Sequence, residues 1–111
     1  MADGIVTLKE RHRRKMERMQ QAVVAIDAAL TLYAREHSGR FIRYGSTAKG
    51  RMRAHSDVDI IADFPDETSI AAAGFAEDTC FAHGMTPDAH AGAYLSAGFK
   101  AEAERRGRVI V

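Results

Sequence analysis

The chain has 111 residues, of which 46% are hydrophobic and 28% are charged, and its formal net charge is +1. This is the length of one ordinary domain, so we expect a single domain over residues 1–111 with a small hydrophobic core. A net charge near zero and an aromatic content of 7% argue against nucleic-acid binding as the main function. The single cysteine, Cys80, excludes an intramolecular disulfide and is interpreted as a small buried side chain.

The sequence also lacks the features of secreted and membrane proteins. Its first residues are polar and charged, which predicts no signal peptide. No apolar run approaches the length of a membrane span. We therefore expect a soluble, cytoplasmic protein with no membrane partner.

The first predicted element is a long helix. The capping-box pattern Thr7-Leu8-Lys9-Glu10 predicts its start, and Ser38-Gly39 predicts its end after about His37. Apolar residues spaced by three and four form one stripe, which consists of Met16, Met19, Val23, Ile26, Leu30 and Tyr33. We expect this stripe to pack on the domain's own sheet, although the same spacing would suit a partner helix. The basic residues within 9–18 are interpreted as a solvated face.

Two strands are predicted next, over residues 40–44 and 58–62, with Phe41 and Tyr44 expected in the core. Gly45-Ser46 ends the first strand, and the basic stretch 47–53 could form one or two helical turns. A second helix is predicted from a cap at Asp66 or Thr68 to about His83, with Gly84 as its stop.

The remaining predicted elements are a weaker strand over 85–91, interrupted by Pro87, a helix over about 92–106 and a final strand over 109–111. Helices mixed with a small sheet indicate an α/β or α+β sandwich, in which a small mixed sheet packs against helices. There is no internal repeat and no linker composition.

Asp57 and Asp59 are the first candidates for chemistry. They are two residues apart on a predicted strand, so both side chains should lie on one face, while Val58 and Ile60 point into the core. Two close carboxylates repel each other and need a compensating charge. A magnesium ion supplies that charge and prefers one or two carboxylates together with substrate phosphates.

Gly45 and Ser46 are candidate phosphate-binding residues. Glycine lets the backbone approach a phosphate closely, and backbone N–H groups at a helix start together with the Ser46 hydroxyl would bind the anion. Lys49, Arg51 and Arg53 follow and could neutralise further phosphate charge, although they could also be merely solvated.

This arrangement resembles the minimal nucleotidyltransferases of the DNA polymerase β-like superfamily. The family signature is Gly-Ser, a spacer of about ten residues, and Asp-x-Asp, which Gly45-Ser46 and Asp57-Val58-Asp59 match. Ser56 before the first aspartate and Ile60-Ile61 after the second also match. The resemblance implies a polymerase β-like α+β fold, with magnesium, expected as two ions, as cofactor and ATP or another nucleoside triphosphate as substrate.

The family has a third carboxylate on a later strand, and Asp88 is its best match here. Pro87 and His90 depart from the apolar strand that the family usually has at this place. Asp63 and Asp66 are rivals for the third position. Asp63 shares the face of Asp57 and Asp59, but it ends the predicted strand, and Asp66 is interpreted as a helix cap.

The resemblance implies transfer of a nucleoside monophosphate, expected to be AMP, to a hydroxyl group with release of pyrophosphate. Short members of the family resemble antitoxins that modify a tyrosine of a small helical HEPN-type ribonuclease toxin. Other relatives modify tRNA ends or antibiotics, and the shortness of the chain favours a protein acceptor over a small molecule. Nucleic acid is not expected as a partner, except tRNA as an acceptor.

Two alternatives from other classes remain open. The chain could be a weakly active or inactive binding module that neutralises a partner protein by direct contact. It could also be a nucleic-acid binder that uses residues 9–18, which the low aromatic content weakens.

Overall fold

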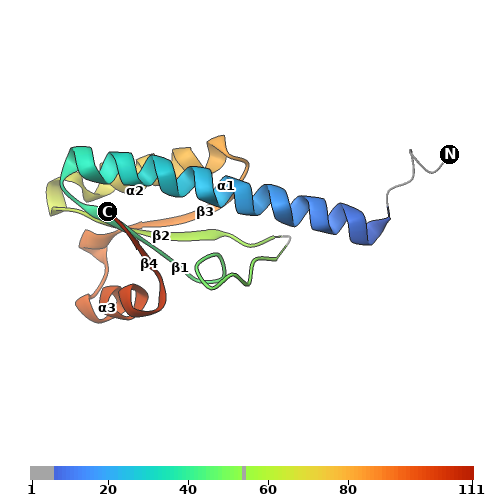
Figure 1. The fold of residues 1–111 in the computed structure, drawn as a ribbon. Coiled ribbons are helices and arrows are strands. Elements are labelled where there is room, and N and C mark those ends of the chain that lie inside the picture. Colours follow the sequence, from blue (N-terminus) through green and yellow to red (C-terminus); the bar gives the residue numbers. More distant parts are fainter. Residues whose placement is uncertain (1–6, 54) are drawn as a thin grey trace.

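The computed structural model describes residues 7–53 and 55–111. Within this part of the chain lie three α-helices, one short 3-10 helix and four strands (Figure 1). In chain order they are α1 (Leu8–His37), β1 (Arg40–Tyr44), β2 (Val58–Asp63), α2 (Asp66–Ala82), β3 (Pro87–Ala91), η1 (Gly92–Tyr94), α3 (Ala97–Arg106) and β4 (Arg108–Ile110). Residues 1–6 and 54 lie outside the described residues, so one domain over 1–111 stays a prediction.

The four strands form one mixed sheet in the order β3-β2-β1-β4. β1 is antiparallel to both β2 and β4, whereas β2 and β3 are parallel. Helices α1 and α2 cover one face of the sheet and α3 lies on the other (Figure 1). The predicted α+β fold is therefore confirmed. No helix in the described ranges combines the length and apolar character that crossing a membrane requires.

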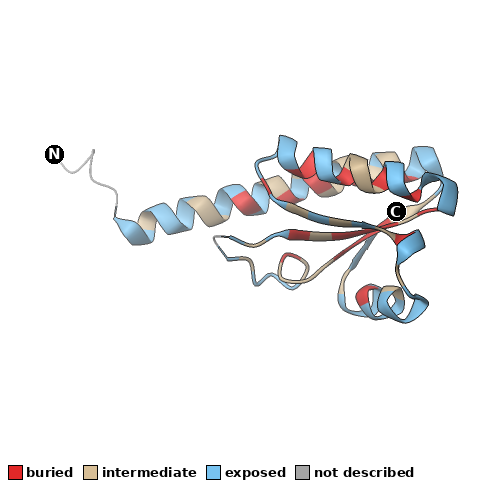
Figure 2. Cartoon of the chain, turned by 180° about the vertical axis from the view of Figure 1, so that it is seen from behind, coloured by how far each residue is buried: buried red, intermediate tan, exposed pale blue. Residues whose placement is uncertain are grey.

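The core lies between the sheet and the layer of α1 and α2. Phe41, Val58 and Ile60 are fully buried there because alternate residues of β1 and β2 face these helices. A smaller cluster on the opposite face joins Ile42 and Ile61 to α3. Figure 2 shows that the buried residues gather in the two central strands and on the inner sides of α1 and α2. The two faces of the sheet are thus covered unequally.

Helix α1 begins as the capping pattern predicts. The backbone N–H of Glu10 donates to the Thr7 hydroxyl at 3.0 Å, but the Glu10 carboxylate pairs with Arg13 and Arg14 rather than returning to the cap. Ser38 ends the helix in a left-handed conformation. Of the predicted apolar stripe, four residues are buried and two are partly buried in the core: Met19, Val23, Ile26 and Leu30, and Met16 and Tyr33 respectively. The expected packing of the stripe on the sheet is confirmed.

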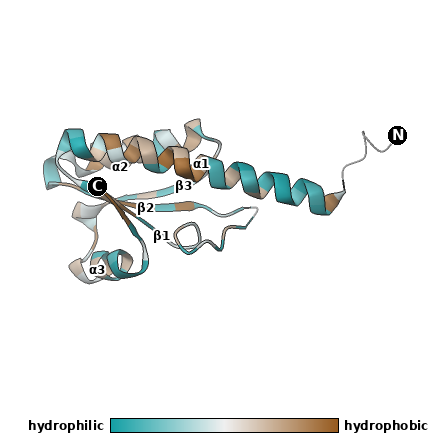
Figure 3. Cartoon of the chain, in the orientation of Figure 1, coloured by the Kyte–Doolittle hydropathy of each residue, from teal (hydrophilic) through white to brown (hydrophobic). Residues whose placement is uncertain are grey.

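The N-terminal half of α1 projects beyond the sheet and is mostly hydrophilic (Figure 3). Arg13 pairs with Glu17 as well as with Glu10 along the helix surface. Because both partners of each pair are exposed to solvent, these pairs add little stability. The basic residues within 9–18 are mostly exposed, as a solvated face requires.

A buried ion pair fastens α1 to β1. The Arg43 guanidinium donates two hydrogen bonds, both 2.9 Å long, to the carboxylate of Asp27. Only 6% of the Arg43 side chain and 15% of the Asp27 side chain are exposed. Such a paired arrangement holds the strand in place, because removing either partner would leave a buried charge alone.

The predicted cap of the second helix, Asp66 or Thr68, is wrong. Helix α2 starts at Asp66, directly after Pro65, and has no side-chain hydrogen bond at its cap. The Thr68 hydroxyl donates to the Pro65 carbonyl at 3.1 Å instead of capping the helix. The proline fixes the backbone angle φ that a helix start needs. The predicted end is confirmed, since Gly84 follows with a positive φ of 74°.

The predicted single helix over residues 92–106 is also wrong. The segment contains the short helix η1 and the separate helix α3, with Leu95 and Ser96 in extended conformation between them. The Ser96 hydroxyl accepts the N–H of Phe99 at 3.1 Å and caps α3. The alanines of this segment favour a helix, but Ser96 acts as an N-cap, and an N-cap residue requires a non-helical backbone. The helix is therefore interrupted at Ser96.

The predicted weak strand forms β3, which starts at Pro87 and is an edge strand. Proline is tolerated at the first residue of an edge strand because its missing N–H removes no bond from the sheet interior. The final strand forms as β4, over Arg108–Ile110.

We predict that Cys80 reacts slowly with thiol reagents in the native protein. Its side chain is fully buried in α2, and burial, with a smaller effect of the Asp27 charge, raises the pKa of the thiol from 9.0 to about 11. The thiolate fraction at pH 8 should therefore fall about 100-fold relative to a free cysteine. Reaction with Ellman's reagent before and after unfolding in urea measures this difference, and equal rates would contradict the buried position.

Candidate active site

Asp59 and Asp88 lie beside each other on the face of the sheet opposite α1 and α2. The two residues are paired in register between the parallel strands β2 and β3. Val58 and Ile60 occupy the core side of β2, so Asp59 points to the other face. Ala89 packs on the core side of β3 and leaves Asp88 on the same face as Asp59. The structure thus brings together two residues that are 29 positions apart in the sequence.

Asp57 lies one residue before the start of β2 and is exposed. It lines a pocket with Lys15 and Met19 of α1, and its charge is one of the smaller causes that raise the pKa of Asp59. The carboxyl of Asp59 is half-buried, whereas 52% of the Asp88 side chain is exposed. The three aspartates therefore differ in exposure: Asp59 is half-buried, whereas Asp57 and Asp88 are exposed.

Burial and neighbouring negative charge act together on Asp59. Burial is the larger cause, followed by the charge of Asp88, hydrogen bonding with Asp88 and the charge of Asp57, and together they raise the pKa of Asp59 from 3.8 to about 6. His90 acts weakly in the opposite direction. An ionised Asp59 at neutral pH is therefore held in an unfavourable environment that a bound cation would relieve.

We predict that Asp59→Asn stabilises the protein in the absence of divalent metal. Because the pKa of Asp59 is raised on folding, its contribution to the free energy of unfolding is full below pH 3.8 and is lost as the pH rises to about 6. The amide does not ionise, so the variant should melt a few degrees higher than the wild type at pH 7.5.

Thermal melts with and without magnesium check this prediction. Magnesium should raise the melting temperature of the wild type and leave the variant unchanged. If Asp59→Asn melts at a lower temperature than the metal-free wild type at pH 7.5, then burial and the charges of Asp88 and Asp57 do not destabilise an ionised Asp59.

The turn after β1 touches the carboxyl of Asp59. Gly45 adopts a positive φ of 74°, and a Cβ atom at this position would lie 2.1 Å from Oδ2 of Asp59. Tyr44, the preceding residue, is paired in register with Asp59. Only glycine fits this contact, because it combines the left-handed backbone with the missing side chain. The Gly-Ser turn is consequently in direct contact with Asp59.

The turn itself is held by backbone hydrogen bonds rather than by a regular helix. The N–H of Lys49 donates to the Gly45 carbonyl at 3.3 Å, and the N–H of Arg51 donates to the Ser46 carbonyl at 3.0 Å. Thr47 is buried and Met52 packs against the core, which anchors both ends of the turn. Residues 47–53 therefore contain no regular helix, although one or two helical turns are predicted there.

The three candidate phosphate-binding cations are all exposed. Lys49 lines a pocket together with Gly45, whereas Arg53 is tied through its backbone N–H to the Ser56 hydroxyl at 2.7 Å. Across residues 7–53 and 55–111, neither Lys49 nor Arg51 nor Arg53 forms an ion pair with an acidic side chain. Their charges are thus available to a ligand, and Lys49 is next to the turn.

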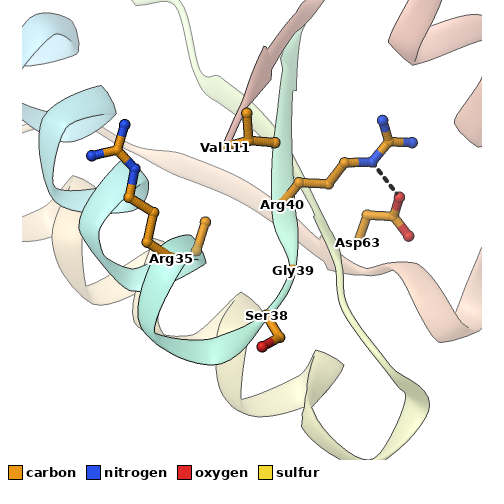
Figure 4. Close-up of a pocket in the computed structure, with 7 residues that line it drawn as sticks. Arg35, Ser38, Gly39, Arg40, Asp63 and Val111 are labelled. Carbon is orange, nitrogen blue, oxygen red and sulfur yellow. Dashed lines mark hydrogen bonds and ion pairs between the residues drawn. The ribbon is translucent and has the colours of Figure 1, made fainter.

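Asp63 has a different environment from its predicted rival Asp88. It lies at the far end of β2, where Arg40 donates to it at 2.8 Å and the Lys100 ammonium lies 3.8 Å away. Figure 4 shows Asp63 and Arg40 beside a pocket of about 470 Å³ that is also lined by Ser38 and Val111. Asp63 is therefore neutralised by cations of the protein itself.

Asp66, the other rival, begins α2. The acid that accompanies Asp59 in register is Asp88. The prediction that the third carboxylate belongs to a later strand agrees with this placement, and its chemical role remains a prediction.

Two further residues, His90 and Tyr44, lie near the aspartates. His90 lies with Nε2 3.0 Å from Oδ1 of Asp88, although 44% of its side chain is exposed. Tyr44, expected in the core, is half-buried on the face of Asp59, where it packs against the smaller cluster formed by Ile42, Ile61 and Ala103. Burial, followed by the charges of Asp59 and Asp88, raises the pKa of its phenol. The alternation of β1, with Phe41 and Arg43 facing the helices, is the signal that could have placed Tyr44 correctly.

The donors fit a magnesium ion bound jointly with a ligand. No three His, Cys, Asp or Glu side chains within the described ranges are arranged to hold a metal ion by themselves. Magnesium is usually held by only one or two carboxylates, with substrate phosphates and water completing its coordination. Asp59 and Asp88 supply that number, and the repulsion at Asp59 favours a cation there.

Comparison with known proteins agrees with the geometry. A family model described as nucleotidyltransferase domain matches residues 10–110. The match includes the turn at Gly45, all three aspartates and every strand. Searches of curated proteins and of solved structures returned no significant match. The chain belongs to the nucleotidyltransferase domain family.

Proposed function

We propose that this protein transfers a nucleoside monophosphate, AMP from ATP, to a hydroxyl acceptor in a magnesium-dependent reaction that releases pyrophosphate. The observation that carries the proposal is the contact between the Gly45 turn and Asp59, with Asp88 in register beside it. A phosphate-binding turn directly against a pair of carboxylates is suited to a triphosphate bound together with a cation. Membership of the nucleotidyltransferase family supports nucleotidyl transfer in general.

Each residue has a defined task in this proposal. The backbone of the turn, the Ser46 hydroxyl and the Lys49 ammonium bind the triphosphate, with Arg51 and Arg53 adding positive charge. Asp57, Asp59 and Asp88 would hold the magnesium, expected as two ions. Bound there, magnesium would neutralise phosphate charge and make the acceptor hydroxyl more acidic.

The reaction is an in-line displacement at the α-phosphorus. The acceptor oxygen forms a bond to this phosphorus while the bond to the bridging oxygen of the β-phosphate breaks, and pyrophosphate leaves. The carboxylate of Asp88 takes the proton of the acceptor hydroxyl, since it is the most exposed member of the close pair. Catalysis would come mainly from positioning and charge neutralisation.

We propose a protein as acceptor, through a tyrosine of a small helical HEPN-type toxin. Asp57 and Asp88 are exposed, and α3 packs against β1 rather than over β3. This open side of the site would admit a bulky acceptor. A tRNA end is the other hydroxyl acceptor to compare in the same assay.

The experiment incubates the protein with labelled ATP, magnesium and the product of the adjacent gene. Covalent label on that product, lost in both Asp57→Ala and Asp59→Ala, is the expected result. Stable binding of the partner without label transfer from any nucleoside triphosphate would contradict the proposal and favour the binding module.

A further inference from the structure

A small aromatic pocket adjoins the Gly45 turn on the side of α3. Its volume is about 190 Å³, and it is lined by Tyr44, Gly45, Lys49, Phe99, Glu102, Ala103 and Arg106. Pockets for whole drug-sized ligands occupy roughly 300–1,000 Å³, so this one is suited to a single ring system. It is distinct from the pocket at Asp63 and lies at the same end of β1 as Asp59.

Two aromatic rings form the pocket's apolar part. The rings of Tyr44 and Phe99 meet edge to face, with centroids 5.8 Å apart and an interplanar angle of 88°. Phe99 belongs to helix α3, and 45% of it is exposed even though it is a large apolar residue. An exposed aromatic ring beside a second ring offers a stacking surface to a planar ligand.

The pocket also carries positive charge at its rim. Lys49 lines it from the turn, and Arg106 lines it from α3. The Arg106 guanidinium is paired with Glu102 at 2.6 Å, whereas Lys49 has no ion pair in the part of the chain that the structure describes. Lys49 therefore belongs both to the pocket and to the turn proposed to bind phosphates.

The pocket and the proposed phosphate site share residues. Gly45 lines the pocket, and the position of its missing Cβ is against Asp59. Tyr44 lines the pocket and is paired in register with Asp59. A ligand with its phosphates at the turn could thus place a ring attached to them in the pocket without crossing another element.

We propose that this pocket binds the heterocyclic base of the nucleoside triphosphate, with Phe99 as the stacking residue. This inference rests on the proposed function, because it assumes a nucleotide at the turn. The occupant is a nucleobase rather than an acceptor side chain because the pocket is continuous with the turn and with Lys49. Phe99 then contributes to affinity for nucleotides and not for phosphate chains alone.

Calorimetric titration tests the assignment with two magnesium-loaded ligands, ATP and inorganic tripolyphosphate, which lacks the base. Phe99→Ala should weaken ATP binding by about tenfold and leave tripolyphosphate binding unchanged. The matched control is Phe81→Ala, which removes an exposed phenylalanine, 64% accessible, from α2 on the opposite side of the sheet. Phe81→Ala should bind both ligands as the wild type does.

Unchanged ATP binding in Phe99→Ala, or an equal loss for both ligands, overturns the assignment. Unchanged ATP binding with loss of transfer would instead mean that the pocket holds the acceptor. If the wild type binds neither ATP nor tripolyphosphate, the proposed function itself is wrong. This outcome differs from the two outcomes that reject only the base pocket.

A second variant keeps the test independent of the alanine substitution. The chain contains no tryptophan, so Phe99→Trp introduces a single reporter into the pocket and retains an aromatic ring. Its fluorescence should change on addition of magnesium ATP and stay constant with magnesium tripolyphosphate. The same response to both ligands, or no response to either, contradicts base binding.

Discussion

Replacing Asp59 with asparagine is expected to lower the rate of nucleotidyl transfer by at least about 100-fold. Asp59 touches the turn at Gly45 on one side and is paired in register with Asp88 on the other. The substitution keeps the shape of the side chain and removes its negative charge, so the proposed cation loses its central ligand. The initial rate of pyrophosphate release at saturating ATP and magnesium measures the effect.

Asp63→Asn is the matched control for this prediction. Asp63 belongs to the same strand, but it is neutralised by Arg40 and Lys100 at the far end of β2. The control should keep most of its activity and lose only some stability. Comparable losses in Asp63→Asn and Asp59→Asn would show that a charge on β2 matters for folding rather than for a site at Asp59.

Gly45→Ala is expected to reduce transfer by about 100-fold as well, through misplacement of Asp59. The new Cβ would lie 2.1 Å from Oδ2 of Asp59, so the carboxyl or the turn must move. The positive φ of 74° adds a destabilisation of about 1–2 kcal/mol. Steady-state kinetics give the activity, and urea unfolding gives the stability.

Gly84→Ala separates the two effects of the Gly45 substitution. Gly84 has the same φ of 74°, but no atom lies within 4 Å of the position of an added Cβ. This variant should show the backbone destabilisation and retain its transfer activity. If Gly45→Ala remains as active as Gly84→Ala, the close contact with Asp59 has no catalytic importance.

The elements with strong local signals were predictable from the sequence. The stripe from Met16 to Tyr33 predicts α1 because its spacing matches one helix face, and a short apolar run bounded by turn residues predicts β2. The wrong predictions concern places where two local preferences of the backbone compete. Asp66 or Thr68 is the predicted cap, but Pro65 occupies the cap position and Asp66 is the first helical residue. The helix propensity of the alanines conceals the extended backbone at Ser96.

The placement of the candidate site was only partly predictable. Two-residue periodicity correctly put Val58 and Ile60 in the core and Asp59 on the opposite face. The register of Asp88 with Asp59 depends on how β3 pairs with β2, which no local pattern specifies. The pocket between Tyr44 and Phe99 depends on the packing of α3 on β1, a contact between distant segments.

The central claim, that the site at Asp59 and Asp88 transfers a nucleoside monophosphate, is tested most directly by the position of the label in ATP. Wild-type protein, magnesium and the purified product of the adjacent gene as acceptor are incubated with ATP labelled on the α-phosphate or on the γ-phosphate. We expect covalent incorporation of the α-label only, with the γ-label released in pyrophosphate and no incorporation by Asp59→Asn. Incorporation of the γ-label, or α-label incorporation that persists in Asp59→Asn, would contradict the account.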